Sequence, residues 1–262
     1  MNLRTCPAIA TIALAGLLTA CASVSPAADA PSLDGTAWVL AALPGQARIA
    51  GSTVTLRFEA GQASGTDGCN RYALPYTASG ASLKFEPSGI TTQMACAPGL
   101  MRQASAFLSS LNGAGSYRVD GTGQLQLLAG DGTLLASLTP QAQDLAGTAW
   151  HVTAYNDGKQ AVVSVLGNTT LTMAFAPDGR VSGSAGCNDY TANYTSAGPS
   201  LGFGPAATTR KMCAEPAHVM EQERQFLQAL GSVASARQEG GRLELRAADG
   251  ALAVSLAQAP AP

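Results

Sequence analysis

Charged side chains are scarce in this chain. They make up 12% of its 262 residues, and the formal net charge is only -2. Aromatic residues are few, at 5%, and no apolar run reaches the roughly 20 residues that a membrane-spanning helix needs. The near-neutral charge excludes a broad nucleic-acid surface, which requires clustered lysine and arginine. With 46% hydrophobic residues, however, the chain is too apolar to be disordered.

Catalytic and metal-binding motifs are missing as well. The chain has only two histidines, His151 and His218, and neither is spaced with the cysteines as in a zinc site. No nucleophile elbow, phosphate-binding loop or HExxH motif occurs. Glu221 and Glu223, beside Arg224 on a predicted helix, are interpreted as a solvated face. The sequence therefore predicts a protein that is not an enzyme and that uses no cofactor or metal.

The N-terminus has the pattern of a secretory signal. Arg4 precedes a short apolar stretch that ends in Leu18-Thr-Ala-Cys21. This ending resembles the bacterial lipobox, which implies cleavage before Cys21 and attachment of acyl chains to that residue. Several acyl chains anchor a protein stably where one does not. A plain signal peptide, with Cys21 uninvolved, is the alternative.

The residues around the cleavage site also predict a location. Ala22, and not an aspartate, follows the cysteine, which by analogy with lipoprotein sorting favours the outer membrane. We therefore expect residues 1–20 to be a signal peptide and residues 21–31 a flexible tether, rich in small residues and proline. The protein is then expected in the bacterial cell envelope, anchored to the outer membrane and facing the periplasm.

Two copies of one domain occupy the rest of the chain. Leu33-Asp-Gly-Thr-Ala-Trp38 recurs as Leu145-Ala-Gly-Thr-Ala-Trp150, and Gly68-Cys-Asn-Arg-Tyr72 recurs as Gly186-Cys-Asn-Asp-Tyr190. All fourteen aromatic residues lie inside the copies, and matched aromatic positions imply matched packing. We expect one domain at residues 32–140 and a second at residues 144–257, with a linker short enough for them to touch.

Each copy is predicted to be mainly β-structure with one helix. Apolar and polar residues alternate over 54–58 and 171–175, which is the period of a half-buried strand, and helical spacing occurs over 100–111 and 219–230. The fold class is therefore α+β: two similar domains, each an antiparallel β-sheet or partly open barrel with one packed helix. Further short strands are expected at 72–76, 82–85, 116–119, 124–128, 134–138, 180–185, 190–194, 201–203, 242–246 and 251–256.

Four cysteines follow Cys21, two in each copy. In an exported protein, an even and repeated set of cysteines indicates a disulfide framework. Four cysteines allow three connectivities, and the duplication favours the pairing that each copy can form alone, Cys69 with Cys96 and Cys187 with Cys213. Unpaired thiols are the alternative.

Four motifs follow one another in both copies: Leu-x-Gly-Thr-x-Trp, Gly-Cys-Asn-x-Tyr, a threonine followed by methionine and cysteine, and a helix with Phe-Leu. This pattern resembles the META domain, or HslJ-like, family of bacterial envelope proteins. The resemblance implies a compact fold like a cracked barrel, an envelope location and a link to stress tolerance. It implies no assigned reaction.

The repeated aromatic and polar residues have two interpretations. The tryptophans are expected to fix the first strand in the core, the asparagines to hold a turn, and the tyrosines to pack while keeping a polar tip. Alternatively, these residues face a ligand. The residues concerned are Trp38, Trp150, Asn70, Asn188, Tyr72 and Tyr190.

The function favoured by these observations is that of a lipid-anchored, non-enzymatic binding or structural protein linked to envelope stress. Its expected partners are the membrane, through the lipid, and an unidentified envelope protein or small ligand, but not nucleic acid. A carrier of a small apolar ligand, or a chaperone-like pilot for another envelope component, is the alternative.

Overall fold

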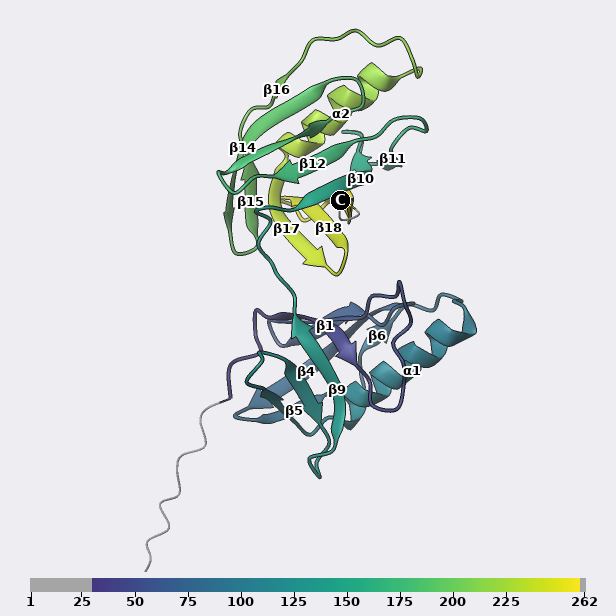
Figure 1. Ribbon diagram of the computed structural model, residues 1–262, viewed down its shortest axis with the longest axis vertical. Helices are drawn as coiled ribbons and strands as arrows, with labels where there is room; N and C mark the ends of the chain where they lie inside the picture. Colours follow the sequence, from purple (N-terminus) through teal and green to yellow (C-terminus); the bar gives the residue numbers. More distant parts are fainter. Residues whose placement is uncertain (1–29, 260–262) are drawn as a thin grey trace, which may run out of the picture.

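The computed structural model describes residues 30–259, which form two sheet-dominated halves joined by one extended segment (Figure 1). The predicted signal peptide, the predicted lipidation residue Cys21 and most of the predicted tether lie outside the described residues. The fold is α+β, as the sequence predicted, and the two halves repeat one arrangement of strands and helix.

The first half is an antiparallel barrel. Eight strands follow one another in the ring β3-β2-β1-β9-β8-β7-β5-β4, which closes because β3 also pairs with β4, and β6 adds to β4. Its elements are β1 (Ala37–Ala42), β2 (Thr55–Glu59), β3 (Gln62–Thr66), β4 (Arg71–Ser79), β5 (Ser82–Phe85), β6 (Ile90–Thr91), α1 (Pro98–Gly113), β7 (Ser116–Val119), β8 (Leu125–Leu128) and β9 (Leu134–Pro140).

The second half forms the equivalent ring, β10-β12-β13-β14-β15-β17-β18-β19, with β19 returning to β10. The short strand β16 pairs with β14, and β11 pairs with the far end of β10. Its elements are β10 (Ala149–Asn156), β11 (Val162–Ser164), β12 (Thr172–Phe175), β13 (Arg180–Ser184), β14 (Asp189–Ala197), β15 (Ser200–Phe203), β16 (Ala207–Thr208), α2 (Val219–Gly231), β17 (Val233–Glu239), β18 (Arg242–Ala247) and β19 (Leu252–Gln258).

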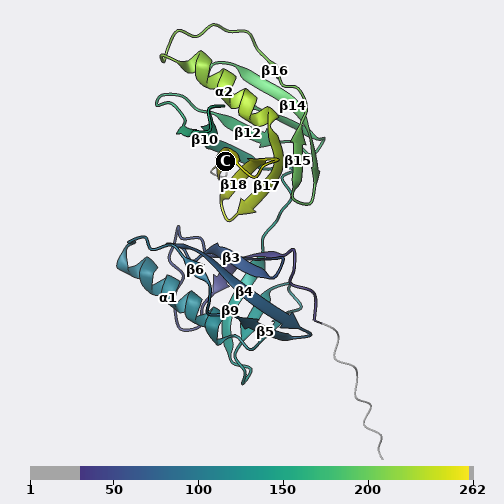
Figure 2. The same ribbon diagram turned by 180° about the vertical axis from the view of Figure 1, so that it is seen from behind.

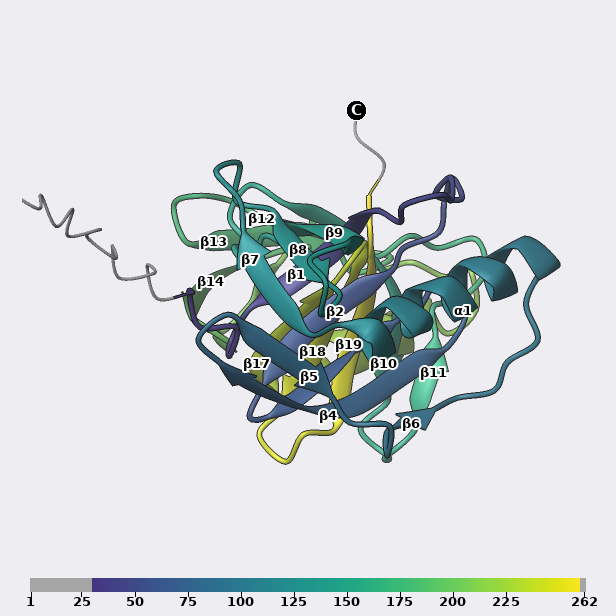
Figure 3. The ribbon, with the colours of Figure 1, turned by 90° about the horizontal axis from the view of Figure 1, so that it is seen from below.

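Each ring is weakly joined at one seam. Strands β5 and β7 meet only at Ser82 and Ser116, and strands β15 and β17 meet only at Ser200 and Ser235. The helix of each half contacts one strand of its seam, β5 or β15. In the view from below, α1 lies along the side of the first barrel (Figure 3). Both rings nevertheless close, whereas the sequence predicted an antiparallel sheet or a partly open barrel.

The two cores use the same aromatic contacts. The ring centroids of Phe58 and Tyr76 are 4.9 Å apart, and those of Phe175 and Tyr194 are 5.0 Å apart. Two further pairs repeat in the same way. They are Phe58–Phe85 (6.1 Å) with Phe175–Phe203 (6.2 Å), and Tyr72–Phe107 (5.9 Å) with Tyr190–Phe226 (5.6 Å). Matched aromatic positions in the sequence therefore do correspond to matched packing.

The strands that have no counterpart among the predicted ranges are β3, β6, β11, β16 and β17. Strand β17 was not predicted, because its sequence Val-Ala-Ser-Ala-Arg-Gln-Glu lacks an apolar alternation. Strand β11 lies where the second copy has its largest insertion, in the loop after β10, so the extra residues extend the edge of the sheet and leave the ring unchanged.

Candidate functional site

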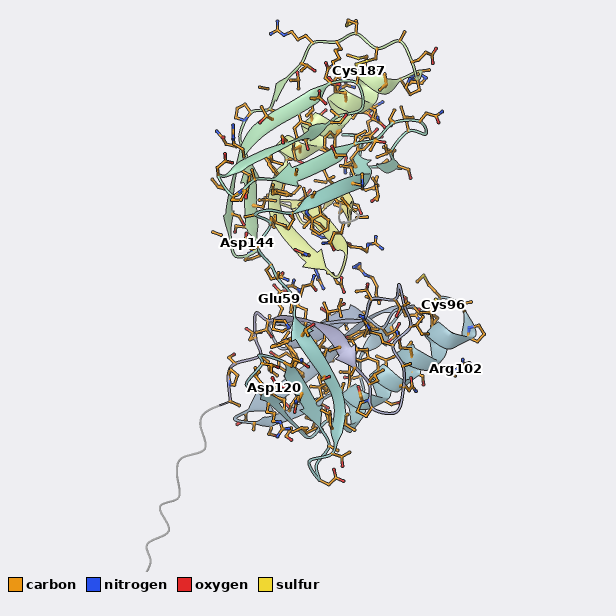
Figure 4. All side chains as sticks on the ribbon, viewed as in Figure 1. Glu59, Cys96, Arg102, Asp120, Asp144 and Cys187 are labelled. Atoms are coloured by element: carbon orange, nitrogen blue, oxygen red, sulfur yellow. A yellow bond between two sulfur atoms is a disulfide. The ribbon has the colours of Figure 1, made fainter. Side chains whose placement is uncertain are left out.

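Two disulfides close the same loop in each half. The sulfurs of Cys69 and Cys96 are 2.05 Å apart, and those of Cys187 and Cys213 are 2.02 Å apart. These are the pairs that each copy can form alone. The bridge joins the turn after β3 to the loop before α1 in the first half, and the turn after β13 to the loop before α2 in the second. Figure 4 labels one cysteine of each bridge.

An asparagine next to each disulfide holds the disulfide-bonded loop in place. Asn70 Oδ1 accepts hydrogen bonds from the Met94 amide, at 2.7 Å, and from Thr92 Oγ1, at 3.1 Å. In the second half, Asn188 Oδ1 accepts from the Lys211 amide and from Thr209 Oγ1, both at 2.7 Å. Both asparagines are buried. Their side chains therefore bond the protein's own backbone.

A buried carboxylate supports each asparagine, but it comes from a different element in each half. Asp67 Oδ1 accepts from the amides of Cys69 and Asn70, at 2.8 and 2.6 Å. The equivalent residue in the second half is Ala185, which has no carboxylate.

In the second half the carboxylate is supplied by helix α2. Glu223 accepts from the Asn188 amide at 2.8 Å and from Asn188 Nδ2 at 3.0 Å. Its equivalent on α1 is Ala104. The interpretation of Glu223 as part of a solvated face was wrong: it is 8% exposed, whereas its neighbour Glu221 forms an exposed pair with Arg224.

The predicted tryptophans and tyrosines are likewise bonded internally. Trp38 Nε1 donates to Thr36 Oγ1 and Trp150 Nε1 to Thr148 Oγ1, both at 2.7 Å. Each tyrosine hydroxyl donates to the backbone of the second ring strand: Tyr72 to the Thr55 carbonyl at 2.6 Å, and Tyr190 to the Thr172 carbonyl at 3.0 Å.

Burial raises the pKa of both tyrosine hydroxyl groups. For Tyr72, the nearby carboxylates of Glu239 and Asp67 raise the pKa further. For Tyr190, burial is the cause. The two hydroxyls therefore remain protonated donors, committed to backbone carbonyls, and do not act as bases.

A repeated glutamine was missed by the sequence analysis. Gln103 Oε1 accepts from the Ile49 amide at 2.8 Å, and its Nε2 donates to Ser52 Oγ at 2.9 Å. Gln222 makes the same two bonds, to the Leu166 amide at 2.7 Å and to Thr169 Oγ1 at 3.1 Å. Both precede the helical Phe-Leu motif by four residues, so alignment of the two copies contained the signal.

A polar interface joins the two halves. The hairpin of β17 and β18 points from the second half onto the first (Figures 1 and 2). Arg71 Nη2 lies 2.9 Å from Glu239 Oε2, and Arg71 Nη1 lies 3.5 Å from Glu244 Oε1. Thr55 Oγ1 donates to Glu239 Oε1 at 2.8 Å. Two hairpin glutamates therefore share one arginine of the first barrel.

Three further contacts surround this ion pair. Arg57 Nη2 donates to the Gln238 carbonyl at 3.2 Å, and Arg237 Nη2 donates to Ser64 Oγ at 3.2 Å. From the linker, Gln141 Oε1 accepts from the Gly240 amide at 3.1 Å. The hairpin is thus held by side chains from β2, β3, β4 and the linker.

The electrostatics of the interface are mixed. Burial of Glu244 by itself raises the pKa of its carboxyl group, but the hydrogen bond from Arg246 and the charges of Arg71, Arg246 and Arg237 outweigh burial, so the net pKa is lowered. Burial, together with the charge of Arg237, lowers the pKa of the Arg57 guanidinium. Two arginines therefore repel one another beside the favourable ion pairs.

Comparison with known protein families assigns both halves of the chain to one family. The META domain matches residues 31–142 and, a second time, residues 143–260. The chain belongs to the META domain family. Each match contains one ring of strands, one helix and one disulfide, so the chain consists of two META domains in tandem.

Solved structures similar to the chain each cover less than half of it. An NMR structure of a protein from Burkholderia xenovorans is 22% identical and covers 45% of this chain and 85% of that chain, with a TM-score of 0.37. A crystal structure of a DUF4847 family protein from Bacteroides vulgatus is 14% identical and covers 45% and 96%, with a TM-score of 0.32. No curated protein matches the chain.

Two clefts lie between the META domains. The larger, about 590 Å³, is bounded by residues 49–53 and Leu100 of the first domain and by Glu239 and Arg242 of the hairpin. The other, about 460 Å³, lies beside the linker, between Arg57 and Gln238. Clefts between domains are common ligand sites, whereas the barrel interiors are filled by side chains such as those of the fully buried Phe58 and Phe175.

Residues 30–259 contain neither a cluster of metal-binding side chains nor a long apolar helix. No group of three or more histidine, cysteine, aspartate or glutamate side chains in this range could hold a metal ion. Neither helix of the same range is long and apolar enough to cross a membrane.

Proposed function

We propose that the protein is a lipid-anchored component of the bacterial envelope whose two META domains form a non-enzymatic binding or structural unit, linked to envelope stress tolerance. One observation carries the non-enzymatic part of the proposal. The repeated polar residues, which are the natural candidates for chemistry, bond backbone groups or one another. A catalytic acid, base or nucleophile must instead be within hydrogen-bond reach of a substrate.

The lipid anchor is supported by the sequence Leu18-Thr-Ala-Cys21 and by the tether after it. Metabolic labelling with palmitate, followed by membrane fractionation, tests it. Wild type should be labelled and recovered with the outer membrane, and Cys21→Ser should be unlabelled. A Cys69→Ser/Cys96→Ser variant that retains label serves as the control for cysteine loss. Equal labelling of wild type and Cys21→Ser would contradict the anchor.

The cleft of about 590 Å³ is where we place the binding activity, because both domains contribute to it. A photo-crosslinking residue at Ala50, an exposed position that lines the cleft, should give crosslinked products in intact cells. The same residue at Thr122, in an exposed turn of the first domain, is the control. Products at both positions, or at neither, would argue against binding in the cleft.

The alternative role as a carrier of a small apolar ligand is disfavoured by the filled barrels. Fully buried phenylalanine and leucine side chains occupy both interiors. An apolar fluorescent probe such as N-phenylnaphthylamine should therefore gain little fluorescence with the protein. Saturable, tight binding of this probe would favour the carrier.

A further inference from the structure

Both META domains contain an equivalent hairpin and an equivalent barrel end that could bind such a hairpin. Only the hairpin of the second domain contacts a barrel end, and that end belongs to the first domain. The β17–β18 hairpin of the second domain is equivalent to the β7–β8 hairpin of the first. The receiving end of the first domain, defined here by Thr55, Arg57, Ser64 and Arg71, is equivalent to residues 172, 174, 182 and 189 of the second. Residues that differ between the hairpin and end in contact and their unpaired equivalents therefore serve the interface, whereas residues that are the same in both copies serve the fold.

The unused receiving end lacks both arginines that face the hairpin in the first domain. Arg57 is replaced by Ala174, and Arg71 is replaced by Asp189. Both replacements are exposed, and the Asp189 side chain is 67% exposed. The two positions that bond the hairpin through hydroxyl groups remain threonine and serine. The one lysine at this end, Lys211, has its ammonium nitrogen 3.8 Å from the Asp189 carboxylate, so the cation there is already paired within its own domain.

The unused hairpin carries one carboxylate where the used hairpin carries two. Glu244 is replaced by Gln126, and Glu239 by the shorter Asp120. The Asp120 carboxylate bonds its own turn, accepting from Gln126 Nε2 and from the amides of Thr122 and Gln124. The Asp120 carboxylate is therefore hydrogen-bonded within its own hairpin and does not bind another domain.

The shape of the hairpin differs in the same sense. A Cβ atom added to Gly240 would lie 2.3 Å from Thr53 Cγ2 of the first domain, whereas one added to the equivalent Gly121 meets nothing within 4 Å. Glycine is thus required at the tip of the used hairpin for close approach. The two copies therefore differ in charge on both sides of the contact and in shape on the hairpin side, as expected if only one of the two contacts is used.

We infer that the β17–β18 hairpin is an intramolecular ligand fitted to the receiving end of the first META domain, and that the free end of the second domain rejects the free hairpin of another copy. The receiving surface fits a hairpin with two glutamates spaced as Glu239 and Glu244. A head-to-tail contact that does not close generates filaments unless its free ends are altered. Asp120 and Asp189, which would meet in such a filament, carry like charges.

Two buried polar atoms without hydrogen-bond partners destabilise the contact between the domains, so the contact depends on its ion pairs. Arg237 Nε and Gln238 Oε1 are buried without a hydrogen-bond partner among the described residues. An unpaired buried polar atom disfavours the closed arrangement. We therefore expect reversal of one charge to open the contact rather than weaken it slightly.

Small-angle X-ray scattering of the full chain, in a Cys21→Ser background without lipid, tests the fit. Arg71→Glu and Glu239→Arg should each increase the radius of gyration, and the double variant Arg71→Glu/Glu239→Arg should return it toward the wild-type value. Circular dichroism and intact disulfides show that the variants are folded. Unchanged scattering for both single variants, or a double variant as extended as the singles, would overturn the inference.

A glycine pair gives a test that changes no charge. Gly240 and Gly80 have similar left-handed backbones, with φ of 59° and 55°, but only Gly240 has a neighbour from the other domain. Gly240→Ala should enlarge the radius of gyration and Gly80→Ala should not. The same scattering from both variants would contradict the close fit.

Sedimentation velocity tests whether the altered free surfaces prevent copies of the chain from associating head to tail. Wild type should remain a monomer as its concentration rises. A variant with the charges restored on both free surfaces, Ala174→Arg/Asp189→Arg with Asp120→Glu/Gln126→Glu, should associate in a concentration-dependent way. A wild-type protein that self-associates through Asp189, or a restored variant that stays monomeric, would contradict this part of the inference.

Discussion

Replacement of Glu223 by alanine should destabilise the second META domain, because this carboxylate is the buried acceptor for Asn188. It accepts from the Asn188 amide at 2.8 Å and from Nδ2 at 3.0 Å, and it is 8% exposed. The side-chain amide keeps a bond to the Lys211 carbonyl at 3.2 Å, whereas the backbone amide loses its acceptor. One buried donor is therefore left unpaired.

The size of the effect follows from those bonds. A hydrogen bond to a charged group contributes about 1.5–3 kcal/mol, and an unpaired buried donor costs about 1–3 kcal/mol. Glu223→Ala should thus lower the free energy of unfolding of the second domain by about 3 kcal/mol. With a urea dependence of about 2 kcal/mol per molar, the midpoint should fall by about 1.5 M.

Urea unfolding followed by tryptophan fluorescence measures this shift. Each domain has one tryptophan, so a Trp38→Phe background leaves Trp150 as the reporter of the second domain. Glu221→Ala, on the exposed side of the same helix, is the control and should change stability by less than about 0.5 kcal/mol.

The first domain suggests a rescue variant. There the carboxylate is supplied by Asp67, at the position of Ala185. Ala185→Asp/Glu223→Ala copies that arrangement and should recover most of the lost stability. A loss below about 1 kcal/mol for Glu223→Ala, or a double variant no more stable than the single one, would refute the proposed exchange of the carboxylate between turn and helix.

Three further results are expected. Loss of the Cys187–Cys213 disulfide by serine substitution should cost up to about 3.5 kcal/mol in the chain-entropy model, measured by urea unfolding, and an unchanged midpoint would contradict this. The folded-state pKa of Glu244 is lowered, so its contribution to the interface is complete above its ordinary pKa and is lost as the pH falls through the folded-state pKa. Small-angle scattering should therefore show a larger radius of gyration only in acid. A larger radius at alkaline pH would contradict this pH dependence. Limited hydrogen peroxide, followed by peptide mass spectrometry, should oxidise Met212, which is 89% exposed, before the fully buried Met173, and the reverse order would show that the loop is packed differently.

The repeat and the core could be predicted from the sequence because they depend on local pattern. Alternation over 54–58 and 171–175 identified strands β2 and β12, and helical spacing identified α1 and α2. Matched aromatic residues identified the core. These signals can be read from each segment alone, because apolar periodicity reflects the one face of that segment that is buried.

Buried polar residues could not be predicted in the same way. Glu223 belongs to a helix whose sequence is charged, and only the approach of Asn188 from a turn 35 residues away gives its carboxylate a buried partner. Strand β17 was missed because its outward residues contact the other domain, so they are polar where an isolated strand would show a clearer pattern. The interface itself depends on Arg71 and Glu239, which are 168 residues apart.

Rotational diffusion of the two META domains tests most directly whether they form one body. Amide nitrogen relaxation measured by NMR on the lipid-free chain gives a correlation time for each domain separately. We predict one common value, that of a particle containing both barrels. Two different and shorter values, each that of a single barrel tumbling on a flexible linker, would contradict the account.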